Sequence, residues 1–298
     1  MELLQLKYFK IVAEVQNMTK VAEELHISQP ALSKTIKSLE KELGVPLFNR
    51  VGRNIQLNNN GLIFLKYVNN SLQSLEDAKK EIKDQNSDTY SDITICVQAG
   101  LIMLPQIISE FNKMYPKIKL HVTQKQFLQK NIVNKNNYDF IIKIPEFDEV
   151  NDENTITLLN EELLLAVPKS HKISKYTSLE LKELSDENFI GLPTFSKLRK
   201  ATDHYCEIVG FTPNVILECY DSNVVIELVK EGLGICFMPK YSWGYKQHQD
   251  ISLIKIYNPK CTRSINLSWD ENSYFSKSSE LFKNFIIDFF NNYSEKNG

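Results

Sequence analysis

The fold of the first sixty residues follows from one stretch of the chain, Ala22-Glu-Glu-Leu-His-Ile-Ser-Gln-Pro-Ala-Leu-Ser-Lys-Thr-Ile-Lys-Ser-Leu-Glu40. Ser28 is a favourable N-cap, and Pro30 falls in the first helical turn after it, where a missing N–H costs nothing. The helix that begins here is expected to end near Leu43, before Gly44. Its apolar residues recur at i, i+4, i+7 and i+11 and form one buried stripe, made of Leu32, Ile36, Leu39 and Leu43.

Two shorter helices are predicted before this one. From Leu3 to Val15, apolar residues recur at helical spacing. A second helix is predicted from Lys20 to Leu25, with Asn17 and Thr19 as capping residues and a turn at His26-Ile27. Two short helices joined by a tight turn form a helix-turn-helix, whose second helix can enter the major groove of DNA.

The exposed face of the third helix carries side chains suited to DNA recognition. They fall at i, i+1, i+4, i+5 and i+8, as Gln29, Pro30, Ser33, Lys34 and Lys37. Gln and Ser can hydrogen bond to base edges, whereas Lys mainly neutralises phosphate. The alternative is that these residues form the solvated face of an ordinary three-helix bundle.

The segment after the third helix favours a β-hairpin. Val45 to Leu57 alternates apolar and polar residues around a Val51-Gly52 turn. Arg50 and Arg53 would then lie beside the third helix, near the DNA backbone. Residues 1–58 hold eight Lys and Arg against six Glu, so this region is basic although the whole chain has a net charge of −2. These features favour a winged helix-turn-helix over an ordinary bundle.

A long helix is predicted next. Its apolar residues follow a 3-4-3 spacing, with Lys79 at the missing position, and are Leu65, Val68, Leu72, Leu75 and Ile82. This spacing is typical of a coiled coil and indicates pairing with a second copy of the chain. Because it covers fewer than three heptads, packing on its own domain is the alternative. The polar stretch Lys83 to Ser91 is predicted to be a hinge.

The rest of the chain alternates short apolar strands with helices. The predicted strands are Ile93 to Val97, Leu120 to Thr123, Phe140 to Ile144, Leu163 to Val167, Phe189 to Leu192, Val215 to Cys219 and Ile235 to Met238. The predicted helices are Leu104 to Met114, Lys197 to Val209 and Val224 to Lys230. This order predicts a doubly wound α/β architecture, in which ligands bind at the carboxyl ends of the strands.

Composition and motifs argue against other classes of protein. With 42% hydrophobic and 24% charged residues the chain is typical of a globular protein. It has no apolar run of about 18 residues and no signal-peptide core, so we expect a cytoplasmic location and no membrane contact. The five cysteines form no Cys-x-x-Cys pair, and the five histidines show no metal-ligand spacing. Because nucleotide-binding and hydrolase motifs are also absent, we expect no enzyme, no metal and no cofactor.

The opening stretch, followed by Leu43-Gly-Val-Pro-Leu-Phe-Asn-Arg50, resembles the N-terminal signature of LysR-type transcription regulators. The resemblance implies that Gln29, Pro30, Ser33 and Lys34 lie in the major groove of double-stranded DNA and that Arg50 and Arg53 belong to the wing. We expect Thr19, Ser28 and Lys37 to contact the DNA as well. It also implies a homodimer formed by the linker helix, a homotetramer built from it, a two-fold related promoter site, and RNA polymerase as a further partner. One departure is Asn58-Asn-Asn-Gly61, where the family usually has Thr and a small residue before Gly, but Asn caps a helix equally well.

The landmarks of the family's effector domain are also present, as Leu104-Pro-Gln-Ile-Ile108, Tyr138-Asp139, Leu164-Leu-Ala-Val-Pro168 and Leu228-Val-Lys-Glu-Gly-Leu-Gly-Ile-Cys-Phe-Met-Pro239. They imply a DNA-binding domain at 1–58, a linker helix and hinge at 59–91, and a two-lobed effector-binding domain at 92–298 that resembles periplasmic binding proteins. Lobe I is expected to comprise 92–160 and 269–298, and lobe II 161–268. A small-molecule co-inducer would bind between the lobes.

The predicted ligand site is made of loops that meet between the lobes, and its residues are Ala99, Gly100, Leu101, Gln124, Gln126, Phe127, Pro193, Phe195, Ser196, Arg199 and Ser222. Backbone N–H groups at the helix starts, together with Arg199, favour a small carboxylate. The alternatives are that Arg199 is a solvated helix residue and that both phenylalanines belong to the core. An alternative function is redox sensing through Cys206 and Cys219, since some family members detect peroxide with a cysteine pair in this lobe. Such a thiol needs an accessible, electropositive site.

Overall fold

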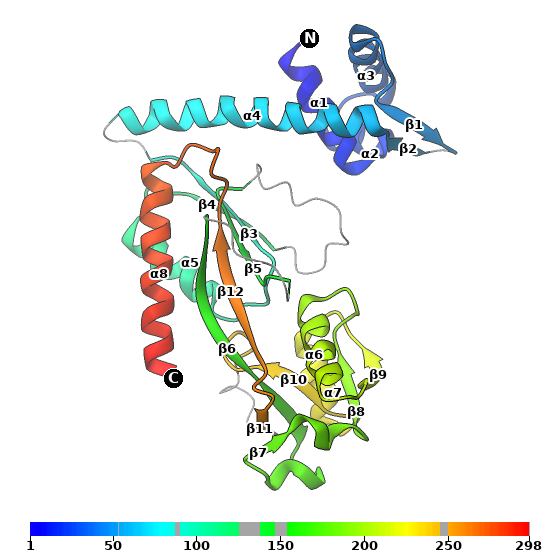
Figure 1. Cartoon of the computed structure of the whole chain (residues 1–298). Coiled ribbons are helices and arrows are strands. Elements are labelled where there is room, and N and C mark those ends of the chain that lie inside the picture. Colours follow the sequence, from blue (N-terminus) through cyan, green and yellow to red (C-terminus); the bar gives the residue numbers. More distant parts are fainter. Residues whose placement is uncertain (53, 87–89, 125–137, 147–153, 245–249, 298) are drawn as a thin grey trace. The chain divides into compact units, whose positions relative to one another are not determined.

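The computed structural model describes residues 1–298 except 53, 87–89, 125–137, 147–153, 245–249 and 298 (Figure 1). The chain divides into two compact units, Met1–Gln85 and Asn86–Gly298, which we call the N-terminal unit and the C-terminal unit and describe separately. Among the described helices, none combines the length and the apolar character that a membrane span requires.

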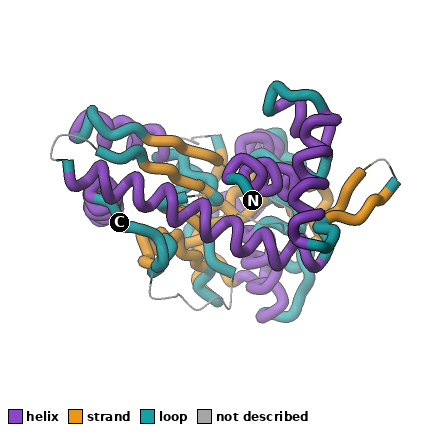
Figure 2. Tube along the Cα trace, turned by 90° about the horizontal axis from the view of Figure 1, so that it is seen from above, coloured by secondary structure: helices purple, strands orange, loops and turns teal. Residues whose placement is uncertain are grey.

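The N-terminal unit contains the predicted helices and hairpin. Its elements are α1 (Leu3–Val15), α2 (Met18–Glu24), α3 (Gln29–Leu43), β1 (Phe48–Val51), β2 (Asn54–Leu57) and α4 (Asn59–Gln85). The two strands pair antiparallel, with Phe48 opposite Leu57, and project from the helices as a wing (Figure 2). The predicted winged helix-turn-helix is confirmed, although α2 begins at Met18 and not at Lys20.

Local capping explains where these helices begin and end. The Asn17 side chain accepts a hydrogen bond from the Lys20 N–H at 3.0 Å, and the Ser28 hydroxyl accepts one from the Ala31 N–H at 3.3 Å. Gly44 ends α3 with a φ of 74°, in the left-handed region that favours glycine. The inward faces meet in one core, which includes Phe9, Val12, Val21, Leu32, Ile36, Leu39 and Leu47.

The start of α4 is fixed against the wing. The Asn58 side chain accepts a hydrogen bond from the Gly61 N–H at 2.9 Å and donates one to the Pro46 carbonyl at 2.9 Å. Asn58 therefore caps this helix, as the sequence predicted. A Cβ on Gly61 would lie 2.5 Å from Leu57 Cδ1 and closer still to the carbonyl oxygen of Leu47, so only glycine fits this close approach.

The apolar seam of α4 is divided between two environments. Leu65 and Val68 are buried in the core of the N-terminal unit, whereas Leu75 and Ile82 are 48% and 61% exposed. The first part of the seam therefore packs on its own unit, which was the alternative to a coiled coil. The helix continues to Gln85, so the predicted hinge begins later than expected, and its residues 87–89 lie outside the described residues.

The C-terminal unit alternates strands and helices. Its strands are β3 (Ile93–Val97), β4 (Leu120–Gln124), β5 (Phe140–Lys143), β6 (Thr155–Pro168), β7 (Ser178–Glu180), β8 (Asn188–Gly191), β9 (Asn214–Glu218), β10 (Cys236–Pro239), β11 (Ile251–Asn258) and β12 (Thr262–Ser268). Its helices are α5 (Leu104–Met114), α6 (Lys197–Ile208), α7 (Ser222–Lys230) and α8 (Lys277–Asn297), with short 3-10 turns η2 (Lys172–Lys175) and η3 (Leu181–Leu184).

A mixed sheet runs through this unit. Its strands follow the order β4-β3-β5-β12-β6-β11-β7, with β10 also paired to β6, while β8 and β9 form a separate parallel pair. β3 is parallel to β4 and β5, as expected for α/β architecture. However, the long strand β6 is antiparallel to β10, β11 and β12. The α/β class is confirmed, and the antiparallel strands β11 and β12 are additions that the sequence did not predict.

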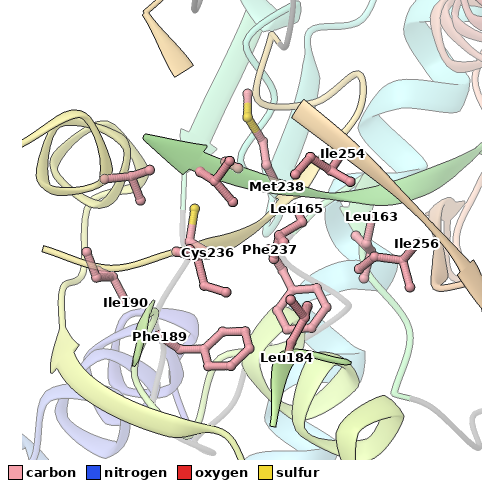
Figure 3. Packing of buried hydrophobic residues seen from close by; sticks show 14 of the residues in the cluster. Leu163, Leu165, Leu184, Phe189, Ile190, Cys236, Phe237, Met238, Ile254 and Ile256 are labelled. Atoms are coloured by element: carbon pink, nitrogen blue, oxygen red, sulfur yellow. The ribbon is translucent and has the colours of Figure 1, made fainter. Parts of the chain in front are cut away.

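Two hydrophobic cores divide the unit into lobes. The core of lobe I joins β3, β5, α5 and α8, where Phe111 lies with its ring centroid 5.2 Å from those of both Phe282 and Phe285. The core of lobe II joins β8, β10, α6 and α7, and Phe189 and Phe237 stack within it (Figure 3).

The strands β6 and β12 cross from one lobe to the other. On β6, Leu159 packs in the core of lobe I and Leu163 in the core of lobe II. On β12, Ile265 and Leu267 pack in the core of lobe I, although the expected boundary at residue 268 assigned them to lobe II. The lobes are therefore joined by continuous strands.

Candidate DNA interface and ligand cleft

The third helix presents its predicted polar face to solvent. Leu32, Ile36 and Leu39 are at most 1% exposed, so the helix is held by one face only. On the other face Gln29, Pro30, Lys34 and Lys37 are exposed, and Ser33 is half-buried. Within the part of the unit that the structure describes, no carboxylate pairs with Lys34 or Lys37. This face can therefore meet an anionic partner without first breaking internal ion pairs.

Other predicted DNA contacts flank this face. Thr19 on α2 and Arg50 on β1 are exposed, and Arg53 lies outside the described residues. Ser28 is exposed too, but its hydroxyl oxygen is engaged in capping α3. In the structure, Ser28 therefore serves to begin α3.

Sequence reasoning missed the residue that joins α3 to the wing. The carboxylate of Glu40, near the end of α3, accepts hydrogen bonds from the N–H groups of Leu47 and Phe48 at 2.8 and 3.3 Å. These donors lie at the start of β1, so two hydrogen bonds tie α3 to the wing. A glutamate one turn before a helix-ending glycine gives no local sign of this contact.

The loop after β3 forms one wall of the predicted ligand site. Ala99 and Leu101 are buried in the core of lobe I, while Gly100 is half-buried. The backbone at Gly100 is therefore what this loop can offer a ligand. Gln124 is exposed at the end of β4, and Gln126 and Phe127 lie outside the described residues.

The opposite wall comes from lobe II. Pro193 is buried, and Phe195 is 38% exposed with its ring 5.8 Å from that of Tyr220. Ser196 is the N-cap residue of α6 and is 7% exposed, yet its hydroxyl does not cap the helix. Ser222 is half-buried at the start of α7.

Arg199 is engaged by partners within lobe II. Its Nε lies 2.8 Å from both carboxylate oxygens of Asp203, and its Nη1 donates to Glu218 at 3.0 Å and to the Leu192 carbonyl at 3.2 Å. The side chain is 12% exposed, so it is not a solvated helix residue. Arg199 ties α6 to β9, and two carboxylates already neutralise the charge that the sequence offered to a ligand.

Two lysines of α6 that no sequence motif marks reach lobe I instead. Lys197 Nζ donates to the carbonyl of Ile144 at 2.6 Å and lies 3.9 Å from a carboxylate oxygen of Glu146. Lys200 Nζ lies 3.5 Å from the other carboxylate oxygen. Ile144 and Glu146 follow β5, more than fifty residues earlier in the chain, so local sequence gave no signal for this bridge.

A buried ion pair lies where the strands cross between lobes. The side chains of Glu161 on β6 and Arg263 on β12 are 0% and 4% exposed, and Arg263 Nε donates to Glu161 Oε1 at 2.8 Å. The N–H groups of Tyr241 and Ser242 each donate to Glu161 Oε2 at 2.9 Å, and the Ser242 hydroxyl donates to Oε1 at 2.7 Å. The Ser242 carbonyl in turn accepts the Ile102 N–H at 2.9 Å. The candidate ligand loop is thus anchored to the same point as the lobe crossing.

A separate cavity lies inside lobe II, beneath α6. Apolar side chains line most of it, including Phe189, Leu198, Phe237 and Trp243, and Arg199 and Asp203 lie at its polar side. Burial raises the pKa of Asp203, and the guanidinium of Arg199 opposes this shift. Because every residue that lines it belongs to lobe II, this cavity is not the predicted site between the lobes, although it shares Arg199 with that prediction.

The predicted redox cysteines have unequal surroundings. Cys206 is fully buried in α6, and burial, followed by the charge of Asp203, raises the pKa of its thiol to about 12. Cys219 is half-buried. The electrostatic neighbours of Cys206 include Cys261, whose pKa burial also raises to about 12. In the described residues no group of three or more His, Cys, Asp or Glu side chains could hold a metal ion.

Comparison with known proteins bears on both units. The family model described as "Bacterial regulatory helix-turn-helix protein, lysR family" matches residues 3–62, and the model "LysR substrate binding domain" matches residues 93–291. The chain is 32% identical over 293 residues to the uncharacterized HTH-type transcriptional regulator YybE of Bacillus subtilis, covering 97% of this chain and 99% of that protein.

Two solved structures share the fold. A full-length OxyR from Pseudomonas aeruginosa, solved with one cysteine replaced by aspartate, superposes with a TM-score of 0.70 at 19% identity, covering 96% of this chain and 94% of that one. Full-length CbnR in complex with its target DNA superposes with a TM-score of 0.53 at 20% identity, covering 97% of this chain and 100% of that one.

Proposed function

Because the chain belongs to the LysR family of bacterial transcription regulators, we propose that it binds promoter DNA through α3 and the wing and responds to a small carboxylate between its lobes. The observation that carries the DNA part is the one-sided burial of α3, which leaves Gln29, Lys34 and Lys37 exposed on a single face. Cations there attract the phosphate backbone, and the amide of Gln29 can reach base edges.

The proposed assembly is a dimer that pairs through the second half of α4. Leu75 and Ile82 continue the apolar spacing of Leu65 and Val68 but are exposed, which supports pairing with a second copy at this end of the helix. Two DNA-binding units related by a two-fold axis require half-sites about one helical turn apart, or a multiple of it. In the proposed tetramer, two such dimers join through their effector-binding domains.

The proposal for the effector-binding domain rests on hydrogen-bond donors in both lobes. Lobe I offers the backbone at Gly100, and lobe II offers the start of α6 with Ser196. Such donors suit a carboxylate. Binding would change the angle between the lobes, and thereby the spacing or bend of the DNA held by the dimer.

Lys34→Ala tests the DNA interface. We expect weaker binding to the chain's own promoter and a salt dependence, plotted as log K against log of salt concentration, that is reduced by about one unit because one phosphate contact is lost. Fluorescence anisotropy with labelled promoter DNA between about 50 and 200 mM salt measures both quantities. The matched control is Lys113→Ala, on α5 of the C-terminal unit, which should keep the full slope. An unchanged slope for Lys34→Ala would remove α3 from the interface.

The surroundings of Cys206 oppose the alternative of redox sensing. The thiolate is the reactive form, and a thiol with a pKa of about 12 is deprotonated to only about one part in 10⁵ at neutral pH. Its thiolate appears only as the pH approaches 12, so reactivity should be negligible from pH 6 to 9.

Thiol labelling checks this expectation. In the native protein we expect one accessible thiol, Cys219, and slow labelling of the four buried thiols until denaturant is added; these are Cys96, Cys206, Cys236 and Cys261. Cys219→Ser should abolish the fast phase. Rapid labelling of Cys206, or a Cys206–Cys219 disulfide after mild peroxide treatment, would instead favour the redox function.

A further inference from the structure

The bridge between the lobes places a carboxylate of the chain itself beside the start of α6. Glu146 of lobe I lies 3.9 Å from Lys197 and 3.5 Å from Lys200, which are three residues apart on α6 and therefore share a face. Lys197 also donates to the Ile144 carbonyl of lobe I. A carboxylate is thus already held at the end of α6 where an anion is most favourable.

A second observation indicates that this end of α6 is built for a ligand. Ser196 is more than nine-tenths buried, and its hydroxyl makes no hydrogen bond with any residue that the structure describes. The hydroxyl oxygen is not fully sealed from solvent, so it remains available to a ligand. The first N–H groups of a helix also lack backbone acceptors. The start of α6 therefore carries hydrogen-bond donors for which the helix itself supplies no acceptor.

We propose that Glu146 is an internal competitor for the effector, occupying the α6 lysines until an effector carboxylate takes its place. The inference rests on the proposed function, because it concerns regulation of the same cleft. On binding, the effector carboxylate accepts from the Ser196 hydroxyl and the α6 N–H groups and pairs with Lys197. Glu146 is released, and the bridge between Glu146 and α6 is exchanged for one that passes through the effector.

The strength of the bridge suits this exchange. The side chains of Lys197, Lys200 and Glu146 are 29%, 48% and 52% exposed. Ion pairs with this exposure contribute little to stability and are screened by salt. An effector therefore needs little binding free energy to displace Glu146 from the two lysines. Arg199 could not act in this way, because Asp203 and Glu218 hold its guanidinium in a largely buried network.

Lysine acetylation of the full chain, read by mass spectrometry at each residue, tests the inference. In Glu146→Gln, labelling of Lys200 should rise at least about twofold, and that of Lys197 less, because Lys197 keeps its bond to the Ile144 carbonyl. The matched control is Glu162→Gln, whose carboxylate pairs with Lys255 and Lys260, each at 3.4 Å. That variant should expose Lys255 and Lys260 and leave the α6 lysines unchanged.

Succinate, compared with sodium chloride at the same ionic strength, tests the competition. It should protect Lys197 at a several-fold lower concentration in Glu146→Gln than in the wild-type chain, and Ser196→Ala should raise that concentration in both. Unchanged labelling of Lys200 in Glu146→Gln overturns the bridge. Equal protection in the two chains, or none in either, overturns the competition. Neither result bears on the salt dependence measured for Lys34→Ala. The competition can therefore be overturned while the proposed DNA-binding function stands.

Discussion

Glu161→Gln is expected to lower the free energy of unfolding of the C-terminal unit by about 3–5 kcal/mol, because it leaves the Arg263 guanidinium buried without its carboxylate. Both side chains are almost completely inaccessible, so water cannot replace the lost partner. The new amide also places an NH₂ group where Arg263 and the Ser242 hydroxyl now donate. Donor would face donor, and one set of hydrogen bonds would be lost along with the charge.

Urea unfolding followed by tryptophan fluorescence measures this effect. Both tryptophans of the chain, Trp243 and Trp269, lie in the C-terminal unit, so the signal reports this unit and not the DNA-binding one. The adjacent Glu162→Gln is the control, since Glu162 pairs with exposed lysines and should cost less than about 1 kcal/mol. Equal midpoints for the two variants would show that the buried pair does not hold the lobe crossing.

The two connections between the lobes differ in strength. At the crossing, Glu161, Arg263 and Ser242 form a buried network that also anchors the Gly100 loop through the Ile102 N–H. At the cleft, Glu146 meets α6 through half-exposed ion pairs. In the proposed mechanism, the buried network would act as a pivot, and the weak contact between Glu146 and α6 would let a ligand change the angle between the lobes without unfolding the unit.

The N-terminal unit could be predicted closely because its signals are local. The cap at Ser28, the end at Gly44 and the periodic stripe Leu32, Ile36 and Leu39 lie within one short stretch, and the structure confirms all of them. The exposure of Lys34 and Lys37 follows directly from the buried stripe, since helix residues that lie off this stripe point toward solvent.

The candidate ligand site was less predictable because the contacts around it join distant residues. In the sequence Arg199 is a cation available to a ligand, but Glu218, nineteen residues later, and Asp203 neutralise it. Glu161 and Arg263 are 102 residues apart, and nothing near either one marks it as buried. The antiparallel pairing of β6 with β12 brings them together, and β12 itself was not predicted.

Gly61→Ala is expected to destabilise the N-terminal unit by at least about 2 kcal/mol. Helix propensity alone predicts the opposite, a stabilisation. In an ordinary helix this change is favourable by about 1 kcal/mol. Here the added Cβ would overlap the carbonyl oxygen of Leu47 and lie 2.5 Å from Leu57 Cδ1. A backbone carbonyl cannot move aside as a flexible side chain can, so the start of α4 must shift away from the wing.

Such a shift would reach the DNA interface through the hydrogen bonds that join α4, the wing and α3. Asn58 ties the start of α4 to Pro46, and Glu40 ties the adjoining Leu47 and Phe48 to α3. Hydrogen exchange of the full chain should therefore show lost protection in peptides from residues 1–58, together with weaker promoter binding, while the tryptophan-monitored transition of the C-terminal unit stays unchanged. Asn60→Ala in the same turn is the control, because it removes one long hydrogen bond of 3.5 Å to Pro46 and should cost less than about 1 kcal/mol. If Gly61→Ala instead increased protection, helix propensity would outweigh the close contact, and the rigid coupling of wing, α4 and recognition helix would have to be abandoned.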